Sequence, residues 1–276
     1  MTQGFLVIAQ NSDVDYVRQA YALALSIKAT QPTINNISIV TNDPVPEEYQ
    51  QAFDQIIPIP FGDAAASSEW KVENRWKLYY ASPYDETIVF DTDMLVLDNI
   101  EHAWKFVKDR DLFFTSHVKD YKDRTIVDTV YRKTFVENHL PNLYCGMFYF
   151  KKSETALTFF KLVEFITNNW QRIYYDNAPK HTQRFFSMDV TVSIAAKILG
   201  IDNEIVHPNS PFTFKHMKPA LQGWDPIPES CLTQLMIYFN DSNELYFNNF
   251  KQSGVVHYVE DQFLTDQIIE QLNVQS

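Results

Sequence analysis

In the first hundred residues, short apolar runs alternate with helix-forming segments, and this alternation limits the possible folds more than any other feature. Four runs have the length of β-strands: residues 5–9, 36–41, 56–60 and 86–90. Helical spacing of apolar residues follows the first run, after a Ser12-x-x-Asp15 pattern typical of a capping box, and recurs over residues 69–80. Strands separated in this way predict right-handed crossovers and a doubly wound, mostly parallel α/β sheet flanked by helices.

The second half of the chain is less regular. Strands are predicted at residues 111–115, 143–150 and 255–257, and helices at 155–170 and 187–199. The polar segment 119–142 and the segment 207–228, rich in Pro and aromatic residues, predict loops. We found no linker, repeat or low-complexity tract, so we expect a single domain.

Charge and cysteine content exclude some classes of function. The 276 residues carry 23 basic and 35 acidic side chains, a net charge of −12, which argues against a dedicated nucleic-acid or anionic-membrane binder. A basic cleft on an acidic body stays possible. Two cysteines, Cys145 and Cys231, form no disulfide framework and no zinc motif. With no signal-peptide pattern and no apolar run of about 18 residues, we expect a soluble, cytoplasmic protein.

Two aspartates, Asp91 and Asp93, directly follow the apolar run 86–90. The carboxyl ends of parallel strands are where ligands bind in α/β sheets, and residues i and i+2 of a strand point to the same side. Two adjacent carboxylates repel each other unless a cation lies between them, and carboxylate oxygens suit Mg²⁺ or Mn²⁺. The pair therefore predicts a divalent-metal site. In the alternative interpretation, Asp91 caps a turn and Asp93 is solvated.

This segment, which continues as Met94-Leu-Val-Leu97, resembles the DxD segment of GT-A-fold glycosyltransferases, and most closely that of glycosyltransferase family 8. Other family features follow in the same order along the chain, from the first strand and its loop at residues 7–11 to a late strand ending in His257. The resemblance implies a single GT-A-like domain over residues 1–276. Its nucleotide-binding half would be residues 1–100, and its acceptor-side half residues 101–276.

The resemblance also implies roles for individual residues. The implied metal ligands are Asp91, Asp93 and His257, and the implied catalytic residues are Asp189 and Lys218. The implied contacts to the nucleotide sugar are Ala9, Gln10, Asn11, Tyr16, Arg75, Lys77, Thr92 and Lys218. Some of these residues also have a purely structural interpretation. His257 fits a core histidine, and Asp189 fits a first-turn acid that stabilises a helix dipole.

The chain departs from the family 8 pattern after the late histidine. In the family, a Gly and then Lys-Pro-Trp follow that histidine, and the Lys contacts the diphosphate; here His257 is followed by Tyr-Val-Glu-Asp-Gln. A His-Met-Lys-Pro run occurs earlier, at residues 216–219. Two alternatives follow: Lys218 replaces the missing contact, or His216 is the third metal ligand in place of His257.

The leading functional hypothesis is a metal-dependent glycosyltransferase that uses Mn²⁺ or Mg²⁺ and a nucleoside-diphosphate sugar, with UDP-sugar favoured. Its acceptor would be a glycan, a protein or a small molecule, and a nucleic-acid acceptor is less favoured because of the net charge. The alternative is a haloacid-dehalogenase-like phosphatase with Asp91 as nucleophile and Asp93 as general acid, although that motif normally lies on the opening strand. A third hypothesis is a GT-A domain that only binds a glycan or a partner.

Overall fold

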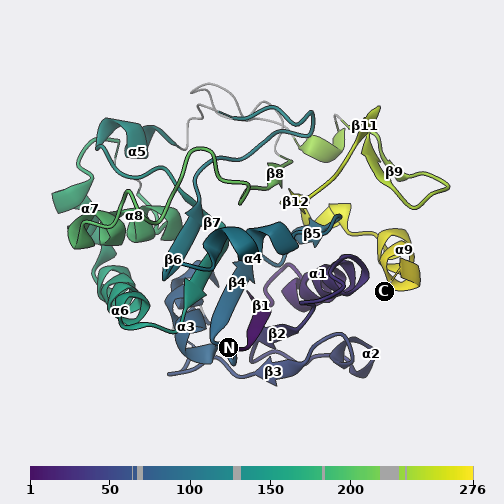
Figure 1. Cartoon of the computed structure of the whole chain (residues 1–276), viewed down its shortest axis with the longest axis horizontal. Helices are drawn as coiled ribbons and strands as arrows, with labels where there is room; N and C mark the ends of the chain where they lie inside the picture. The colour runs from purple at the N-terminus through teal and green to yellow at the C-terminus, as the bar shows by residue number, and fades with distance from the viewer. Residues whose placement is uncertain are drawn as a thin grey trace.

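The structure, a computed structural model, describes residues 1–63, 65–66, 71–126, 132–181, 184–217, 230–233 and 235–275. Its centre is a six-stranded sheet with the order β3-β2-β1-β4-β7-β6 (Figure 1). The strands are β1 (Gln3–Ile8), β2 (Ile37–Val40), β3 (Gln55–Ile57), β4 (Glu86–Phe90), β6 (Leu112–Thr115) and β7 (Tyr144–Lys151). The first four strands pair in parallel, and β7 runs antiparallel to both β4 and β6. The predicted mostly parallel sheet is therefore confirmed.

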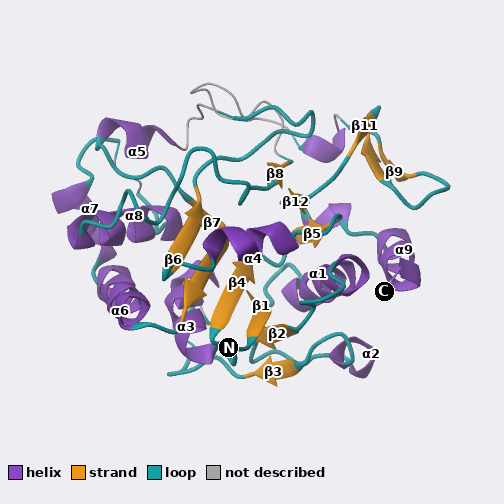
Figure 2. Ribbon diagram, in the orientation of Figure 1, coloured by secondary structure: helices purple, strands orange, loops and turns teal. Residues whose placement is uncertain are grey.

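Helices cover both faces of this sheet, as Figure 2 shows. One face packs against α1 (Tyr16–Thr30), α4 (Glu101–Val107) and, beyond them, α9 (Asp266–Gln275). The other face packs against α3 (Leu78–Ala81), α6 (Glu154–Asn168), α7 (Trp170–Asn177) and α8 (Met188–Leu199). Neighbouring residues of β4 separate accordingly: Ile88 and Phe90 belong to the first core and Val89 to the second. This three-layer arrangement explains why β4 is buried throughout.

Two small sheets lie outside the central one. The first has the order β5-β12-β8 and consists of β5 (Met94–Val96), β12 (Val255–His257) and β8 (Lys215–His216). The second, which extends from the body in Figure 1, consists of β9 (Ile237–Phe239), β10 (Leu245–Phe247) and β11 (Phe250–Lys251). The remaining elements are α2 (Glu47–Gln50), α5 (Lys133–Glu137) and the 3₁₀ helices η1 (Lys71–Lys77), η3 (Cys231–Thr233) and η4 (Asp261–Phe263).

Several local predictions differ from the structure. The N-cap of α1 is Asp15, whose side chain accepts a hydrogen bond from the Arg18 amide, so the capping box starting at Ser12 was wrong. The helix predicted over 69–80 is a 3₁₀ helix followed by one turn of α-helix, and residues 69 and 70 lie outside the described residues. The helix predicted over 155–170 breaks at Asn169, which lies between α6 and α7. Predicted loops also contain α5 and β8, while residues 127–131 and 218–229 lie outside the described part.

No helix among the described residues combines the length and the apolar character that a bilayer crossing requires.

Candidate active site

The two aspartates lie where the central sheet meets the sheet β5-β12-β8. The Asp91 amide donates to the carbonyl of Gly146 on β7 at 2.9 Å, so Asp91 is attached to the central sheet. The carbonyl of Asp93 accepts from the Tyr258 amide at 3.0 Å, so Asp93 is attached to the small sheet. The pair therefore joins two sheets at the carboxyl end of β4, the edge that the sequence predicted for a ligand.

His257 completes this cluster. Strand β12 pairs antiparallel with β5, with His257 opposite Met94, and His257 Nε2 lies 2.9 Å from Asp93 Oδ2. One ligand atom each from Asp91, Asp93 and His257 fall within 4.8 Å of one another. Two carboxylate oxygens and an imidazole nitrogen at this spacing fit a divalent cation. These three residues, predicted from the sequence as metal ligands, are thus brought together.

His216, the alternative third ligand, lies beside this cluster. Strands β8 and β12 pair in parallel with His216 opposite His257, and the two ring centroids are 4.9 Å apart. The group that could hold a metal among the described residues contains His257 rather than His216. The geometry therefore favours His257.

Arg75 reaches Asp91 from η1. Its guanidinium forms an ion pair with the Asp91 carboxylate, and its Nη1 donates to the Cys145 carbonyl at 3.1 Å. The side chains of Arg75 and Asp91 are 18% and 15% exposed, so water screens the pair only partly. The arginine is thus held in a fixed orientation next to the DxD pair.

Gly146 leaves room for Asp91. A Cβ atom at this position would lie 2.8 Å from Met94 Cε and 3.2 Å from Asp91 Oδ2. Any larger residue would push against the carboxylate and the strand that follows it. The glycine in β7 therefore allows the close approach of Asp91.

Burial and neighbouring charges shift the pKa values of the two carboxylates in opposite directions. Burial raises the pKa of Asp91, and the Asp93 charge adds to this rise although Arg75 opposes it. Burial also disfavours the charge on Asp93, but the charge and hydrogen bond of His257 outweigh it, so the pKa of Asp93 is lowered. The Tyr16 hydroxyl lies nearby, and burial together with the charges of Asp93 and Asp91 raises its pKa. Bound cationic charge would relieve this concentration of negative groups.

Two pockets meet at this cluster. The first, of about 150 Å³, is lined by Ile8, Gln10, Tyr16, Lys71, Val72, Arg75, Asp91, Thr92 and Asp93. The second, of about 330 Å³, is lined by residues that include Arg132, Tyr144, Phe185, Asp189, Phe214, His216 and His257. Val72, Arg75 and Asp91 line both pockets. A ligand in one pocket therefore adjoins a ligand in the other at Arg75 and Asp91.

Only some of the remaining residues predicted for nucleotide binding line the smaller pocket. Gln10, Tyr16 and Thr92 line the smaller pocket. Ala9 is fully buried in the core, and the exposed Asn11 accepts a hydrogen bond from the Val17 amide through Oδ1.

Lys77 is 2% exposed and donates to the Gly62 carbonyl. The structure thus gives Lys77 a structural role apart from the cluster, and Lys71 is the lysine of η1 that lines the smaller pocket.

Asp189 lies in the larger pocket, at the start of α8. Its Oδ1 accepts from the Cys145 amide at 2.8 Å, and its Oδ2 accepts from Arg132 at 2.8 Å. Arg132 also donates to the Leu143 carbonyl at 2.7 Å, and its guanidinium lies 3.4 Å from the centroid of the Tyr144 ring. Sequence analysis missed Arg132, because an isolated basic residue in a polar segment gives no signal before its partner is known. Lys218, the other predicted catalytic residue, lies outside the described residues.

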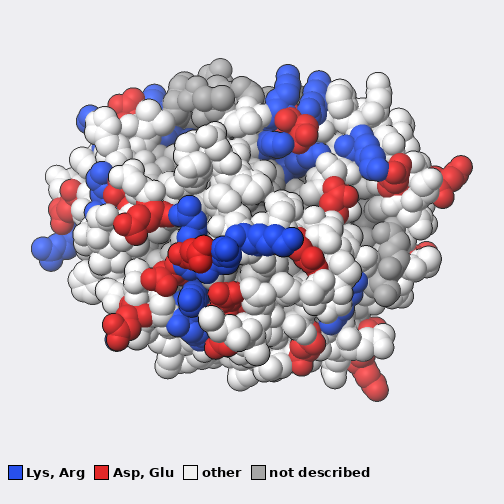
Figure 3. Space-filling view, in the orientation of Figure 1, with Lys and Arg blue, Asp and Glu red and all other residues white. Residues whose placement is uncertain are grey.

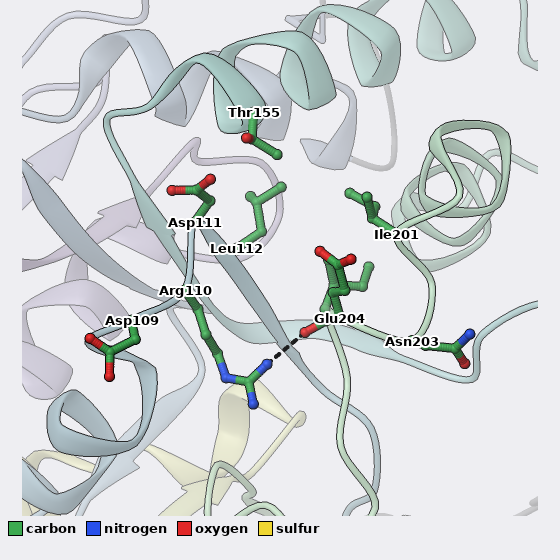
Figure 4. A pocket seen from close by; sticks show the side chains of 9 residues that line it. Asp109, Arg110, Asp111, Leu112, Thr155, Ile201, Asn203 and Glu204 are labelled. Atoms are coloured by element: carbon green, nitrogen blue, oxygen red, sulfur yellow. Dashed lines mark hydrogen bonds between the residues drawn. The ribbon is translucent and has the colours of Figure 1, made fainter.

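A further pocket lies at the opposite end of the sheet. It has a volume of about 410 Å³, adjoins the start of β6, and is lined by Asp109, Asp111, Glu204 and others, as Figure 4 shows. Arg110 donates there to the backbone carbonyl of Glu204 at 2.8 Å. Because it lies at the amino end of β6, this pocket is remote from the edge where ligands bind in α/β sheets.

Comparison with solved structures identifies the fold. The galactosyltransferase LgtC, in complex with donor and acceptor sugar analogs, matches with a TM-score of 0.58 and 15% identity over 98% of this chain and 95% of that one. Mouse xyloside xylosyltransferase 1 matches with a TM-score of 0.50 and 13% identity over 80% of this chain and 89% of that one. This chain therefore has the GT-A glycosyltransferase fold.

The glycosyltransferase GlyE of Streptococcus pneumoniae TIGR4 also matches, at 14% identity, with a TM-score of 0.41 over 76% of this chain, which spans 46% of that protein's length. No protein-family model and no curated protein matches this sequence.

Proposed function

We propose that this protein transfers a sugar from a nucleoside-diphosphate sugar, with UDP-sugar favoured, to an acceptor hydroxyl, and that it does so with Mn²⁺ or Mg²⁺. The observation that carries this proposal is the group formed by Asp91, Asp93 and His257 at the carboxyl end of β4, next to two adjoining pockets. The GT-A fold supports it. The phosphatase alternative is not favoured, since its aspartates normally follow the first strand and here they follow β4.

In this proposal Asp91, Asp93 and His257 would hold the cation, which would supply positive charge beside the diphosphate. Arg75 adds a fixed positive charge on the same side, because Asp91 and the Cys145 carbonyl orient its guanidinium. A group oriented before the reaction loses little conformational freedom when the leaving charge develops. Arg75 would thus stabilise the departing diphosphate.

We assign the nucleotide to the smaller pocket and the transferred sugar and acceptor to the larger one. Tyr16, Gln10 and Thr92 supply an aromatic ring and hydrogen-bonding groups beside the DxD pair. The larger pocket carries Asp189, whose carboxylate is fixed by Arg132 and by the Cys145 amide. This carboxylate is suited to accept a hydrogen bond from a sugar hydroxyl, and Lys218 stays a proposed diphosphate contact. A glycan, protein or small molecule would supply the acceptor hydroxyl.

A thermal-shift panel of nucleotides and nucleotide sugars, with and without Mn²⁺, tests the proposal. We expect a nucleoside diphosphate or its sugar conjugate to raise the melting temperature only when Mn²⁺ or Mg²⁺ is present. The ligand that gives the largest shift is then incubated with enzyme and metal, and release of the free nucleoside diphosphate is measured. If no nucleotide shifts the melting temperature with either metal, the proposed function is wrong.

A further inference from the structure

A third pocket adjoins the candidate active site and contains two lysines. It has a volume of about 230 Å³ and is lined by Lys119, Lys215, Asp123, Ser253 and Asp98, among others. Phe214 lines both this pocket and the larger pocket of the candidate site. Figure 3 shows Lys and Arg side chains gathered near this part of the surface, above β8. On a chain with a net charge of −12, such a gathering is unexpected.

Backbone pairing places two lysines side by side in this pocket. Lys119 forms an isolated parallel bridge with Lys215: the Lys119 amide donates to the Phe214 carbonyl, and the His216 amide donates to the Lys119 carbonyl. Like charges on neighbouring strands repel each other. The Lys215 side chain is only 6% exposed, so water screens its ammonium group poorly. The pair therefore needs a counter-anion.

The Asp123 carboxylate lies close to both lysines. Asp123 Oδ1 lies 3.1 Å from the Lys119 ammonium and 3.8 Å from that of Lys215. Lys215 also donates to the Ser253 hydroxyl at 3.2 Å. Asp123 is 58% exposed and belongs to a turn with a φ of 67°, so it reaches the lysines from the surface. Asp98 also lines the pocket, and its more distant charge acts on Lys215 as well. At ion-pair distance, one negative charge faces two positive charges.

We propose that this pocket binds the phosphate group of a small molecule. In the free protein, the Asp123 carboxylate occupies the position that the phosphate group takes when it binds. A phosphate carries about two negative charges near neutral pH and offers several acceptor oxygens, so it matches two ammonium groups where a single carboxylate does not. A volume of about 230 Å³ has room for a phosphate group and part of a small molecule. This inference does not depend on the proposed function.

Binding of inorganic phosphate tests the proposal. It is measured by calorimetry and by thermal shift in EDTA, with no nucleotide present and at constant ionic strength. We expect phosphate to stabilise the protein, Lys119→Met and Lys215→Met each to weaken binding about fivefold or more, and Asp123→Asn to tighten it by about fivefold. The opposite signs distinguish ligand binding from general destabilisation. Asn tolerates a positive φ, so Asp123→Asn keeps the test open even if Lys215→Met does not fold.

Two control variants locate the bound anion. Lys28→Met removes a lysine that also pairs with an aspartate, Asp54, at 3.3 Å, and should leave phosphate binding unchanged. Lys71→Met alters the smaller pocket of the candidate site and should also leave it unchanged. The proposal is overturned if the lysine variants Lys119→Met and Lys215→Met bind like the wild type, if Asp123→Asn weakens binding, or if only Lys71→Met abolishes it.

Two further ligands identify the source of the phosphate group. Glucose 6-phosphate binding more tightly than inorganic phosphate indicates a phosphate monoester as the ligand, and equal binding indicates free phosphate. Acetate, with one charge, should bind much more weakly. Acetate binding as strong as that of phosphate would contradict the charge match and overturn the proposal.

Discussion

The central sheet and the sheet β5-β12-β8 are built from the sequence in different ways. Strands β1 to β4 are separated by one crossover each, and their parallel pairing follows from local alternation. Strands β5, β8 and β12 come from distant parts of the chain and contain two or three residues each. The candidate site uses both sheets, because Asp91 is bonded to β7 and Asp93 to the residue after β12. A regular sheet thus positions the first carboxylate, and a long-range pairing supplies the histidine.

The largest effect is expected where the two sheets meet. Asp93→Asn removes a carboxylate of the proposed metal site and the partner of His257, which lies 2.9 Å away. We expect sugar transfer to fall by roughly 10²–10³-fold, the loss that corresponds to several kcal/mol of transition-state stabilisation. The metal-dependent thermal shift should disappear as well. Both are measured at matched protein concentration, with circular dichroism to confirm the fold.

The matched control for this change is Asp109→Asn. The Asp109 side chain is 86% exposed and lies 3.8 Å from Lys108, so its charge contributes little. We expect wild-type activity and metal response from this variant. Full activity in Asp93→Asn would mean that the two sheets do not share a metal site.

Variants of the two histidines test which strand of the small sheet contributes the third metal ligand. His257→Ala removes the member of the cluster that β12 contributes, and we expect Mn²⁺ affinity to fall about a hundredfold or more. His216→Ala changes the neighbouring strand at a ring-centroid distance of 4.9 Å from His257, and we expect a loss of about tenfold or less. Calorimetric titration of Mn²⁺ into each variant measures both. A larger loss in His216→Ala would assign the third ligand to β8.

Substitutions at two glycines distinguish an effect on stability from an effect on metal binding. A Cβ at Gly146 would meet Met94 and Asp91, whereas a Cβ at Gly4, in β1, would lie 2.5 Å from the Tyr84 ring. We expect Gly146→Ala and Gly4→Ala each to lower the free energy of unfolding by about 1–3 kcal/mol through overpacking. Only Gly146→Ala should also weaken Mn²⁺ binding. Urea unfolding and metal titration of both variants test this, and an equal loss of metal affinity in both would contradict it.

The sequence predicted features of the central sheet better than contacts between distant parts of the chain. The DxD pair was found because its apolar strand and its two aspartates are contiguous, and the edge strand β3 ends directly before Pro58. The Arg132–Asp189 pair could not be found, since the two residues meet only after α8 packs near β7. The choice between His216 and His257 also stayed open, because it depends on the register of β12 against β5 and β8.

The smallest effect is expected at the N-terminus of α1, the helix between β1 and β2, where the structure has a different cap from the predicted one. Asp15 caps α1 by accepting from the Arg18 amide at 2.9 Å, whereas Ser12 Oγ accepts from the Val14 amide at 3.5 Å, outside the helix. Asp15→Ala should therefore lower the free energy of unfolding by about 1 kcal/mol, and Ser12→Ala by much less. Urea unfolding of the two variants measures the difference. A larger loss in Ser12→Ala would restore the capping box that the sequence suggested and would contradict the structure of this turn.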